Sequence, residues 1–262
     1  MAGPERAIDL GFVDLRGNSR PKKDEEYQLI PVSSETMADL PYPADHDFRT
    51  LSLDLYGLYV DEMPEFWSSY EGLVKVTIDT RNPAKLNEKQ KDVSFVTKFN
   101  SDKHSYAPTF LYRGVFRNVV FKEWINLKID LFELDTDASE YYEKIKAVID
   151  GVPEMKSLDV LSGIPYLGVA TKLFDSIITT FGKNPDDHLW GEFPILEGDP
   201  VIGGAFLRSG LYVLFEKTNS DDQKITPDSL KYTSGKLIAS SGTQMPTHLI
   251  FGVKIKGFTQ SI

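Results

Sequence analysis

The sequence predicts a mainly β protein, an antiparallel β-sandwich that carries an inserted helical segment. About nine stretches of the 262-residue chain alternate apolar and polar residues with the period of two that half-buried strands require. The stretches with helical periodicity are grouped in one block, at about 138–185. No internal repeat and no low-complexity linker interrupts the chain. Strands at near-regular spacing with segregated helices are typical of a sandwich, so we expect one such domain over 51–262.

A loop-rich extension is expected at the N-terminus, over residues 1–50. Its only strand signal is a short one, at 8–15. The stretch is rich in charged residues, and it contains five prolines: Pro4, Pro21, Pro31, Pro41 and Pro43.

Strand periodicity dominates from Leu51 onward. Leu51, Leu53 and Leu55 alternate with polar or amphipathic residues, as the two faces of a half-buried strand should. The same pattern recurs along the chain outside the helical block. The further predicted strands are 73–78, 93–99, 112–121, 127–134, 189–195, 210–217, 231–239 and 248–256.

Two helices are predicted within the block. The first covers 138–149, follows Asp137 as its N-cap, and is closed by Gly151 and Pro153. The second covers 164–181 and ends at Gly182, a suitable C′ residue. Its apolar residues recur at intervals of three and four, which gives an amphipathic helix. The stripe needs burial, either against the sandwich flank or against a partner, and its candidate partner-binding residues are Leu173, Phe174, Ile177 and Ile178.

Composition excludes several classes of function and location. The formal net charge is −10, so the average field repels nucleic acid. The chain has no cysteine, which excludes disulfides, thiolate metal sites and cysteine nucleophiles. We see no signal peptide and no uninterrupted apolar run of roughly 18 residues that could span a membrane. These features together predict a cytoplasmic protein.

Catalytic motifs are not found, and no catalytic residue is predicted. The four histidines are His46, His104, His188 and His248, and no serine lies in a G-x-S-x-G turn beside them. No glycine-rich stretch has the spacing of a phosphate-binding or dinucleotide-binding loop. The two Asp/His clusters, at 45–47 and 186–188, are expected to be polar loops rather than zinc sites. We therefore expect a protein that is not an enzyme.

Carboxylates form the more informative pattern. Glu133, Asp135 and Asp137 occupy every second position at the end of a predicted strand. Such alternation places them on one side of the chain, where hard oxygen ligands can converge on calcium. An EF-hand is excluded, because its sixth position would be Glu140 instead of glycine and its twelfth would be Lys146 instead of glutamate.

Three segments resemble the C2 domain, a calcium- and lipid-binding β-sandwich family. The stretch LKIDLFELDTD at 127–137 resembles the strand and third loop of that family, and DDHLWGEFPIL at 186–196 resembles the returning half. The stretch at 51–78 resembles the first strand, the acidic first loop and the second strand. In it, the residues from Glu71 to Val76 correspond to the family pattern D-P-Y-V-K-V.

The resemblance covers roughly residues 50–217 and implies calcium as the bound ion. The metal would bridge the protein to anionic lipid. Two departures affect the site: glutamates at 71 and 133 replace aspartates, and an insertion of about fifty residues splits the third loop. The ligands that the resemblance implies are Asp61, Glu71, Glu133, Asp135, Asp137, Asp186 and Asp187.

The functional expectation is a non-catalytic binding or interaction module. In one version it binds a membrane or a protein in a calcium-dependent way. In the alternative version the sandwich is a structural scaffold or self-assembling subunit, without metal, whose helical insertion docks a protein partner or a second copy of the chain. Calcium titration and light scattering distinguish the two versions.

Overall fold

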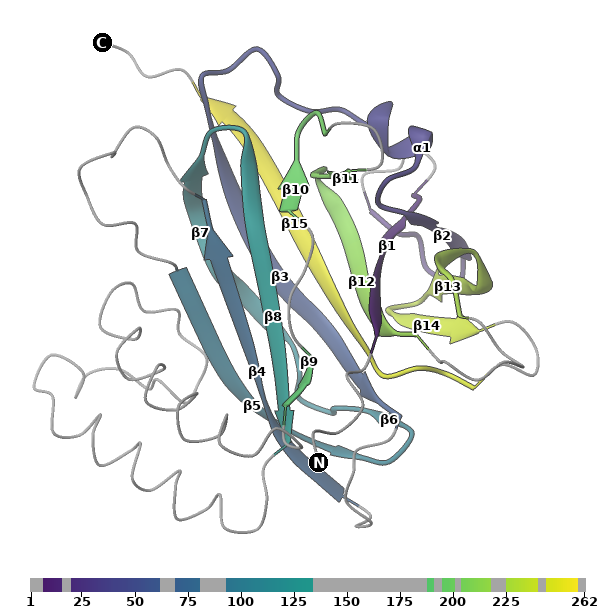
Figure 1. Cartoon of the computed structure of the whole chain (residues 1–262). Coiled ribbons are helices and arrows are strands. Elements are labelled where there is room, and N and C mark those ends of the chain that lie inside the picture. Colours follow the sequence, from purple (N-terminus) through teal and green to yellow (C-terminus); the bar gives the residue numbers. More distant parts are fainter. Residues whose placement is uncertain are drawn as a thin grey trace, which may run out of the picture.

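A computed structural model describes residues 7–15, 20–61, 69–80, 93–133, 188–190, 195–200, 204–217, 225–239 and 244–258. Over these residues the chain is mainly β and forms two sheets, which lie as two layers (Figure 1). Every pair of neighbouring strands is antiparallel except one short parallel pair in the smaller sheet. The prediction of a mainly β, antiparallel protein is confirmed.

Within the described residues, the larger sheet contains nine strands. Its two longest strands, β15 and β3, pair along nearly their whole length, and β7 pairs with β3 beside β6. A short helix, α1 (Glu35–Ala38), follows β2. In spatial order the strands are β14 (Lys236–Ala239), β13 (Leu230–Thr233), β2 (Tyr27–Pro31), β1 (Ile8–Val13), β12 (Gly210–Glu216), β15 (His248–Phe258), β3 (Phe48–Val60) and β6 (Ser105–Tyr106), with β7 (Tyr112–Phe121) also on β3.

The described part of the smaller sheet contains six strands. Its centre is the antiparallel set β8–β4–β5, and the parallel pair β10–β11 lies at one edge. The strands in order are β11 (Ala205–Phe206), β10 (Ile195–Glu197), β8 (Trp124–Glu133), β4 (Ser69–Asp79) and β5 (Val93–Asp102), with β9 (His188–Trp190) also paired to β8.

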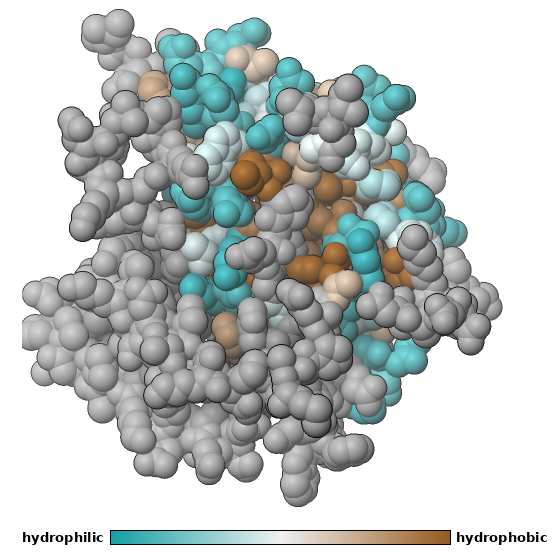
Figure 2. Space-filling model, viewed as in Figure 1, coloured by the Kyte–Doolittle hydropathy of each residue, from teal (hydrophilic) through white to brown (hydrophobic). Residues whose placement is uncertain are grey.

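One hydrophobic core joins the two sheets. Alternate residues of β3, such as Leu53, pack in the same cluster as Val76 of β4 and Ile129 of β8. The period of two in the sequence therefore marks the inner face of each sheet. In Figure 2 apolar residues gather between β8 and β12 and polar residues surround them, so the core approaches the surface in that view.

The larger sheet also buries part of its outer face. Along β12, Tyr212 and Leu214 belong to the core between the sheets, whereas Leu211, Val213 and Phe215 belong to a second apolar cluster. That second cluster includes residues of β1, β2 and the β13–β14 hairpin, so the sheet curls back over its own outer face. Because both faces of β12 are buried, its sequence is a continuous apolar run.

Most predicted strands are present with small changes of boundary. The strand predicted at 231–239 is two strands, because Ser234 and Gly235 adopt positive φ values of 46° and 86° and turn the chain. The strand predicted at 189–195 overlaps two separate strands, β9 and β10. Residues 1–50 supply β1, as predicted, and also β2, which their prolines and charges did not indicate. Both predicted helices, 138–149 and 164–181, lie outside the described residues.

Candidate functional site

Strands from both sheets end together near Asp61. Strand β3 finishes at Val60, where Tyr59 pairs with Tyr106 of β6 on one side and with His248 of β15 on the other. In the smaller sheet, β4 begins at Ser69 opposite Asp102 of β5. We call this region, defined by Asp61, Ser69, Asp102, Glu133 and His248, the Asp61 end.

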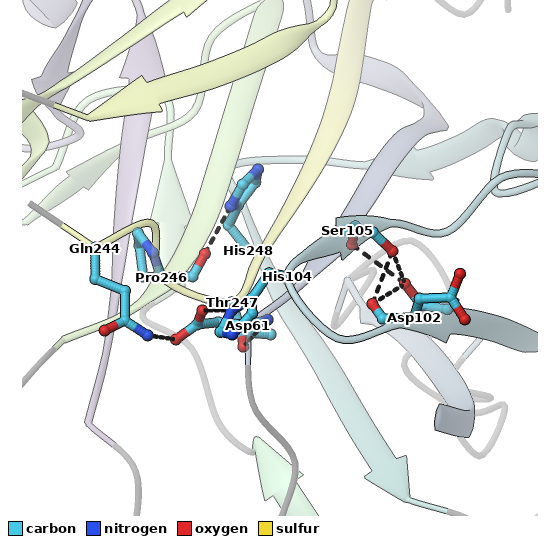
Figure 3. Close-up of polar contacts among 9 residues, drawn as sticks. Asp61, Asp102, His104, Ser105, Gln244, Pro246, Thr247 and His248 are labelled. Atoms are coloured by element: carbon cyan, nitrogen blue, oxygen red, sulfur yellow. Dashed lines mark hydrogen bonds and ion pairs between the residues drawn. The ribbon is translucent and has the colours of Figure 1, made fainter. Parts of the chain in front are cut away.

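Asp61 is held by three neighbours at this end (Figure 3). One carboxylate oxygen lies 2.7 Å from Nδ1 of His104, and the other accepts a hydrogen bond of 2.7 Å from Nε2 of Gln244. The backbone amide of Asp61 donates to Oγ1 of Thr247 at 3.1 Å. His104 is half exposed, whereas only 16% of the Asp61 side chain is accessible. The carboxylate is thus oriented by two donors that themselves reach solvent.

A buried histidine anchors the strands behind Asp61. His248 is fully buried, and this burial lowers its pKa to about 4. Its Nδ1 lies 2.8 Å from the carbonyl oxygen of Pro246, which can only accept, so Nδ1 carries the proton. The neutral ring can then accept at Nε2 from the hydroxyl of Tyr106, at 2.8 Å. That hydroxyl also accepts from the amide of Leu237, at 2.8 Å.

The histidine network joins three separate segments of the chain. Tyr106 belongs to β6, Leu237 to β14 and His248 to β15, and Tyr59 of β3 stacks on the imidazole with a centroid distance of 5.1 Å. Burial also raises the pKa of the Tyr106 hydroxyl well above its usual range, so the phenol stays protonated and can donate. The network is a neutral polar cluster with its hydrogen bonds satisfied.

Two serines complete the Asp61 end. The Oγ atoms of Ser101 and Ser105 lie 3.2 Å apart, and Ser105 donates to the carbonyl oxygen of Asp102 at 2.7 Å. These bonds close the turn between β5 and β6, which carries His104 at a positive φ of 56°. The hydroxyls therefore stabilise the turn that presents His104 to Asp61.

The structure locates three of the seven predicted calcium ligands. Asp61 follows β3 directly, Glu71 lies in β4 opposite Asn100, and Glu133 is the last residue of β8. The Glu133 side chain is 6% exposed and shares the core-facing side of β8 with Leu131. Among the residues that the structure describes, no three His, Asp or Glu side chains form a group that could hold a metal.

The structure does not describe the rest of the predicted site. The side chain of Glu71 is not described. The other calcium ligands, Asp135, Asp137, Asp186 and Asp187, lie outside the described residues. The same holds for the predicted partner-binding residues Leu173, Phe174, Ile177 and Ile178.

The strands that precede and follow the predicted third loop in the sequence, β8 and β9, pair with each other. Leu131 pairs with Trp190, and Phe132 pairs with His188. Strand β8 thus ends at Glu133, and β9 begins beside the same strand end. Trp190 is buried and donates from Nε1 to Oε1 of Glu216 in β12, at 2.8 Å, which ties β9 to the larger sheet.

Sequence reasoning did not find the partners of Asp61. His104 is 43 residues away and Gln244 is 183 residues away, and neither lies in a motif. The buried pair of Tyr106 and His248, which are 142 residues apart, was also missed. Only the alternation of apolar residues in the predicted strand at 248–256 could have indicated that His248 begins a buried strand.

No helix in the described part of the chain has the length and hydropathy needed to cross a bilayer. No protein-family model, no curated protein and no solved structure matches this chain. The function is therefore inferred from the residues and from the geometry of the Asp61 end.

Proposed function

We propose that this chain is a non-catalytic binding module, built on a C2-like β-sandwich, that binds an anionic membrane surface at its Asp61 end with calcium as the bridging ion. The two packed antiparallel sheets and their shared core are compatible with such a sandwich. The proposal assigns binding to strand connections, where a rigid sheet scaffold can position ligand-binding residues.

The observation that supports the proposal is the pairing of β8 with β9. The predicted ligands Asp135 and Asp137 follow β8 in the sequence, and Asp186 and Asp187 directly precede β9. Pairing of Phe132 with His188 brings the described segments that precede and follow the long insertion in the sequence to one strand end. A long insertion between paired borders is thermodynamically acceptable, because the entropy of loop closure grows only logarithmically with length.

In the proposed site, Asp61 would exchange its present hydrogen-bond partners for the cation. Its carboxylate already accepts hydrogen bonds from Gln244 and from His104, so a cation would have to displace these donors. Both donors extend from the surface, and both can turn toward solvent when the metal arrives. Calcium accepts six to eight oxygen ligands in flexible geometry, which suits carboxylates contributed by several connections.

Thermal unfolding with and without calcium tests whether the protein binds this metal. In protein first stripped with a chelator, calcium at a hundredfold excess over its dissociation constant should stabilise the fold by about 2.7 kcal/mol. Magnesium should do less, because it requires stricter octahedral geometry and loses water reluctantly. The double variant Asp135→Asn, Asp137→Asn should abolish the calcium-dependent rise of the melting temperature, and Asp61→Asn should reduce it.

A matched control is Asp45→Asn. Asp45 is exposed and precedes the start of β3, at the other end of that strand from Asp61, so its variant should respond to calcium as the wild type does. If calcium does not shift the melting temperature of the chelator-treated wild type, calcium binding is contradicted. That result would favour the alternative, a metal-free scaffold whose insertion docks a protein partner. Light scattering would then report self-assembly, and Ile177→Asp should disrupt it.

A further inference from the structure

A second polar site lies at the opposite end of β3 and β8 from the Asp61 end. It is a pocket of about 620 Å³ between the α1–β3 connection, the β7–β8 turn and the turn that follows β10. This volume falls in the range of small-molecule sites, roughly 300–1,000 Å³. Two buried arginines, Arg49 and Arg208, lie in its wall together with Tyr42.

Arg208 is only 4% exposed and carries a full positive charge. Its Nη1 donates to the carbonyl oxygens of Gly198 and Leu207, at 2.6 and 2.9 Å, and its Nη2 donates to that of Ala38, at 3.3 Å. The buried Nε has no hydrogen-bond partner. The partners of this guanidinium within the described chain are thus carbonyl dipoles, and one buried N–H is unused.

Arg49 also lies against the Tyr42 ring and has similar partners. It is 7% exposed and donates to the carbonyl oxygens of Pro43, Ala44 and Lys122. Both guanidinium carbons lie over the Tyr42 ring, at 5.0 Å for Arg49 and 5.1 Å for Arg208. The aromatic face attracts each cation, but it cannot neutralise two like charges.

Tyr42 supplies a second unused donor. Its hydroxyl oxygen is buried and has no hydrogen-bond partner among the described residues. Burial raises the pKa of this phenol, so the hydroxyl keeps its proton. The ring lies against Gly198, where an added Cβ would come within 2.4 Å of the hydroxyl oxygen, so glycine is needed for the ring to occupy this place.

The mouth of the pocket has the opposite charge. Glu123, Glu197 and Asp199 also line the pocket, and Asp199 and the Glu123 side chain are exposed. A purely anionic ligand would meet these carboxylates first. A ligand with an anionic group directed inward and a cationic group at the mouth would satisfy both regions.

We propose that this pocket binds a small amino-acid-like zwitterion. The Tyr42 ring, which now covers Gly198, turns on binding, so that its hydroxyl and Arg208 Nε, which are both buried, donate to the ligand's carboxylate, and the ligand's ammonium faces the carboxylates at the mouth. An acceptor with full negative charge satisfies both unused donors and offsets the paired guanidinium charges. A cation at the mouth is attracted chiefly by Asp199, because the Glu123 carboxylate already lies 3.6 Å from Nζ of Lys122. The site is separate from the Asp61 end, and its occupancy does not depend on calcium.

Ligand variants test each half of the zwitterion. The twenty common amino acids are first compared by thermal unfolding at millimolar concentration. The one with the largest effect is then titrated by calorimetry beside its amide, its N-acetyl derivative and inorganic phosphate. Loss of one charge-assisted contact should weaken binding roughly tenfold or more, so the amide and the N-acetyl derivative should both bind less tightly than the parent. Phosphate should not bind.

Two tyrosine variants separate ligand binding from folding. Tyr42→Phe removes a hydroxyl that makes no hydrogen bond, so the urea midpoint should not fall, whereas affinity for the amino acid should fall roughly tenfold. Tyr106→Phe is the matched control, because its hydroxyl bonds to His248 and Leu237. Its urea midpoint should fall while its affinity for the amino acid stays at the wild-type value.

Three outcomes would overturn the proposal. One is that none of the twenty amino acids raises the melting temperature. Another is that the N-acetyl derivative binds as tightly as the parent, which would remove the role of the acidic mouth. The third is that Tyr42→Phe lowers the urea midpoint and leaves affinity unchanged, which would make the tyrosine a structural residue only.

Discussion

His248 shows how a titratable side chain can be used as a neutral structural element. Its two ring nitrogens are hydrogen-bonded, to Pro246 and Tyr106, and its ring stacks on Tyr59. Such a fully satisfied polar group is tolerated in a core, whereas a charged imidazole there would have to be desolvated. The stability of the fold is therefore linked to the protonation of one residue.

This linkage predicts a pH dependence with a definite sign. The pKa of His248 is about 4 in the folded protein and about 6.5 in an unfolded chain. Between these values the unfolded state binds a proton that the native state excludes, so stability is lost as pH falls from 6.5 toward 4. Between pH 7 and pH 5 the histidine should lower the free energy of unfolding by about 2 kcal/mol.

Urea unfolding of the wild type and of His248→Gln over this pH range measures the effect. Other titrating groups are common to both proteins, so their contribution cancels in the comparison. The difference in free energy between the two proteins should shrink as pH falls, because only the wild type carries the buried imidazole. Parallel curves would contradict a neutral buried His248.

At the scale of the elements, β1 and β12 join distant parts of the chain. The two strands pair antiparallel, from Ile8 opposite Glu216 to Phe12 opposite Tyr212, although about two hundred residues separate them in the sequence. Phe12 is 3% exposed and meets Tyr212 edge to face, with a centroid distance of 5.0 Å. The N-terminal strand thus completes the sheet beside β12 and contributes to the core.

Truncation of Phe12 tests the contribution of this N-terminal strand. Phe12→Ala removes a buried aromatic ring from the core, and such substitutions cost about 3–5 kcal/mol. The urea midpoint should fall accordingly. Lys23→Ala, at an exposed residue of the same N-terminal region, is the control and should stay within about 0.5 kcal/mol of the wild type. A Phe12→Ala protein as stable as this control would show that β1 is dispensable.

Local periodicity predicted the strands but not their partners. The predicted strand at 112–121 coincides with β7, and the run at 210–217 matches β12 to one residue. Strand β2 was missed because its five residues end at Pro31 and follow a charged stretch. The turn at Ser234 and Gly235 was missed because the apolar pattern on both sides hid a hairpin. Strand order depends on contacts between distant segments, which periodicity does not encode.

Candidate sites were predictable to the same limited extent. The alternating acids pointed to the end of β8, and the structure brings β9 to that strand end. The contacts of Asp61 with His104 and Gln244 and the pocket around Arg208 both arise from segments far apart in the sequence. A single buried arginine in a loop has no sequence signature, because only the fold reveals that its Nε is unpaired.

At the scale of the whole molecule, charge sets the conditions for the proposed membrane binding. The chain has a formal net charge of −10, so an anionic bilayer repels it on average. Calcium at the Asp61 end would reverse the local potential and permit binding there. The pocket around Arg208 lies at the other end of β3 and β8, so its ligand should neither require nor prevent this binding.

Sedimentation with phosphatidylserine-containing vesicles tests the central claim most directly. The wild type should pellet with vesicles in millimolar calcium and stay in solution when calcium is chelated, because only the metal overcomes the repulsion between two anionic surfaces. Asp135→Asn with Asp137→Asn should stay in solution in both conditions, and Asp45→Asn should behave as the wild type. A wild-type protein that remains in solution with calcium, or that pellets equally with chelator, would contradict calcium-bridged membrane binding at the Asp61 end.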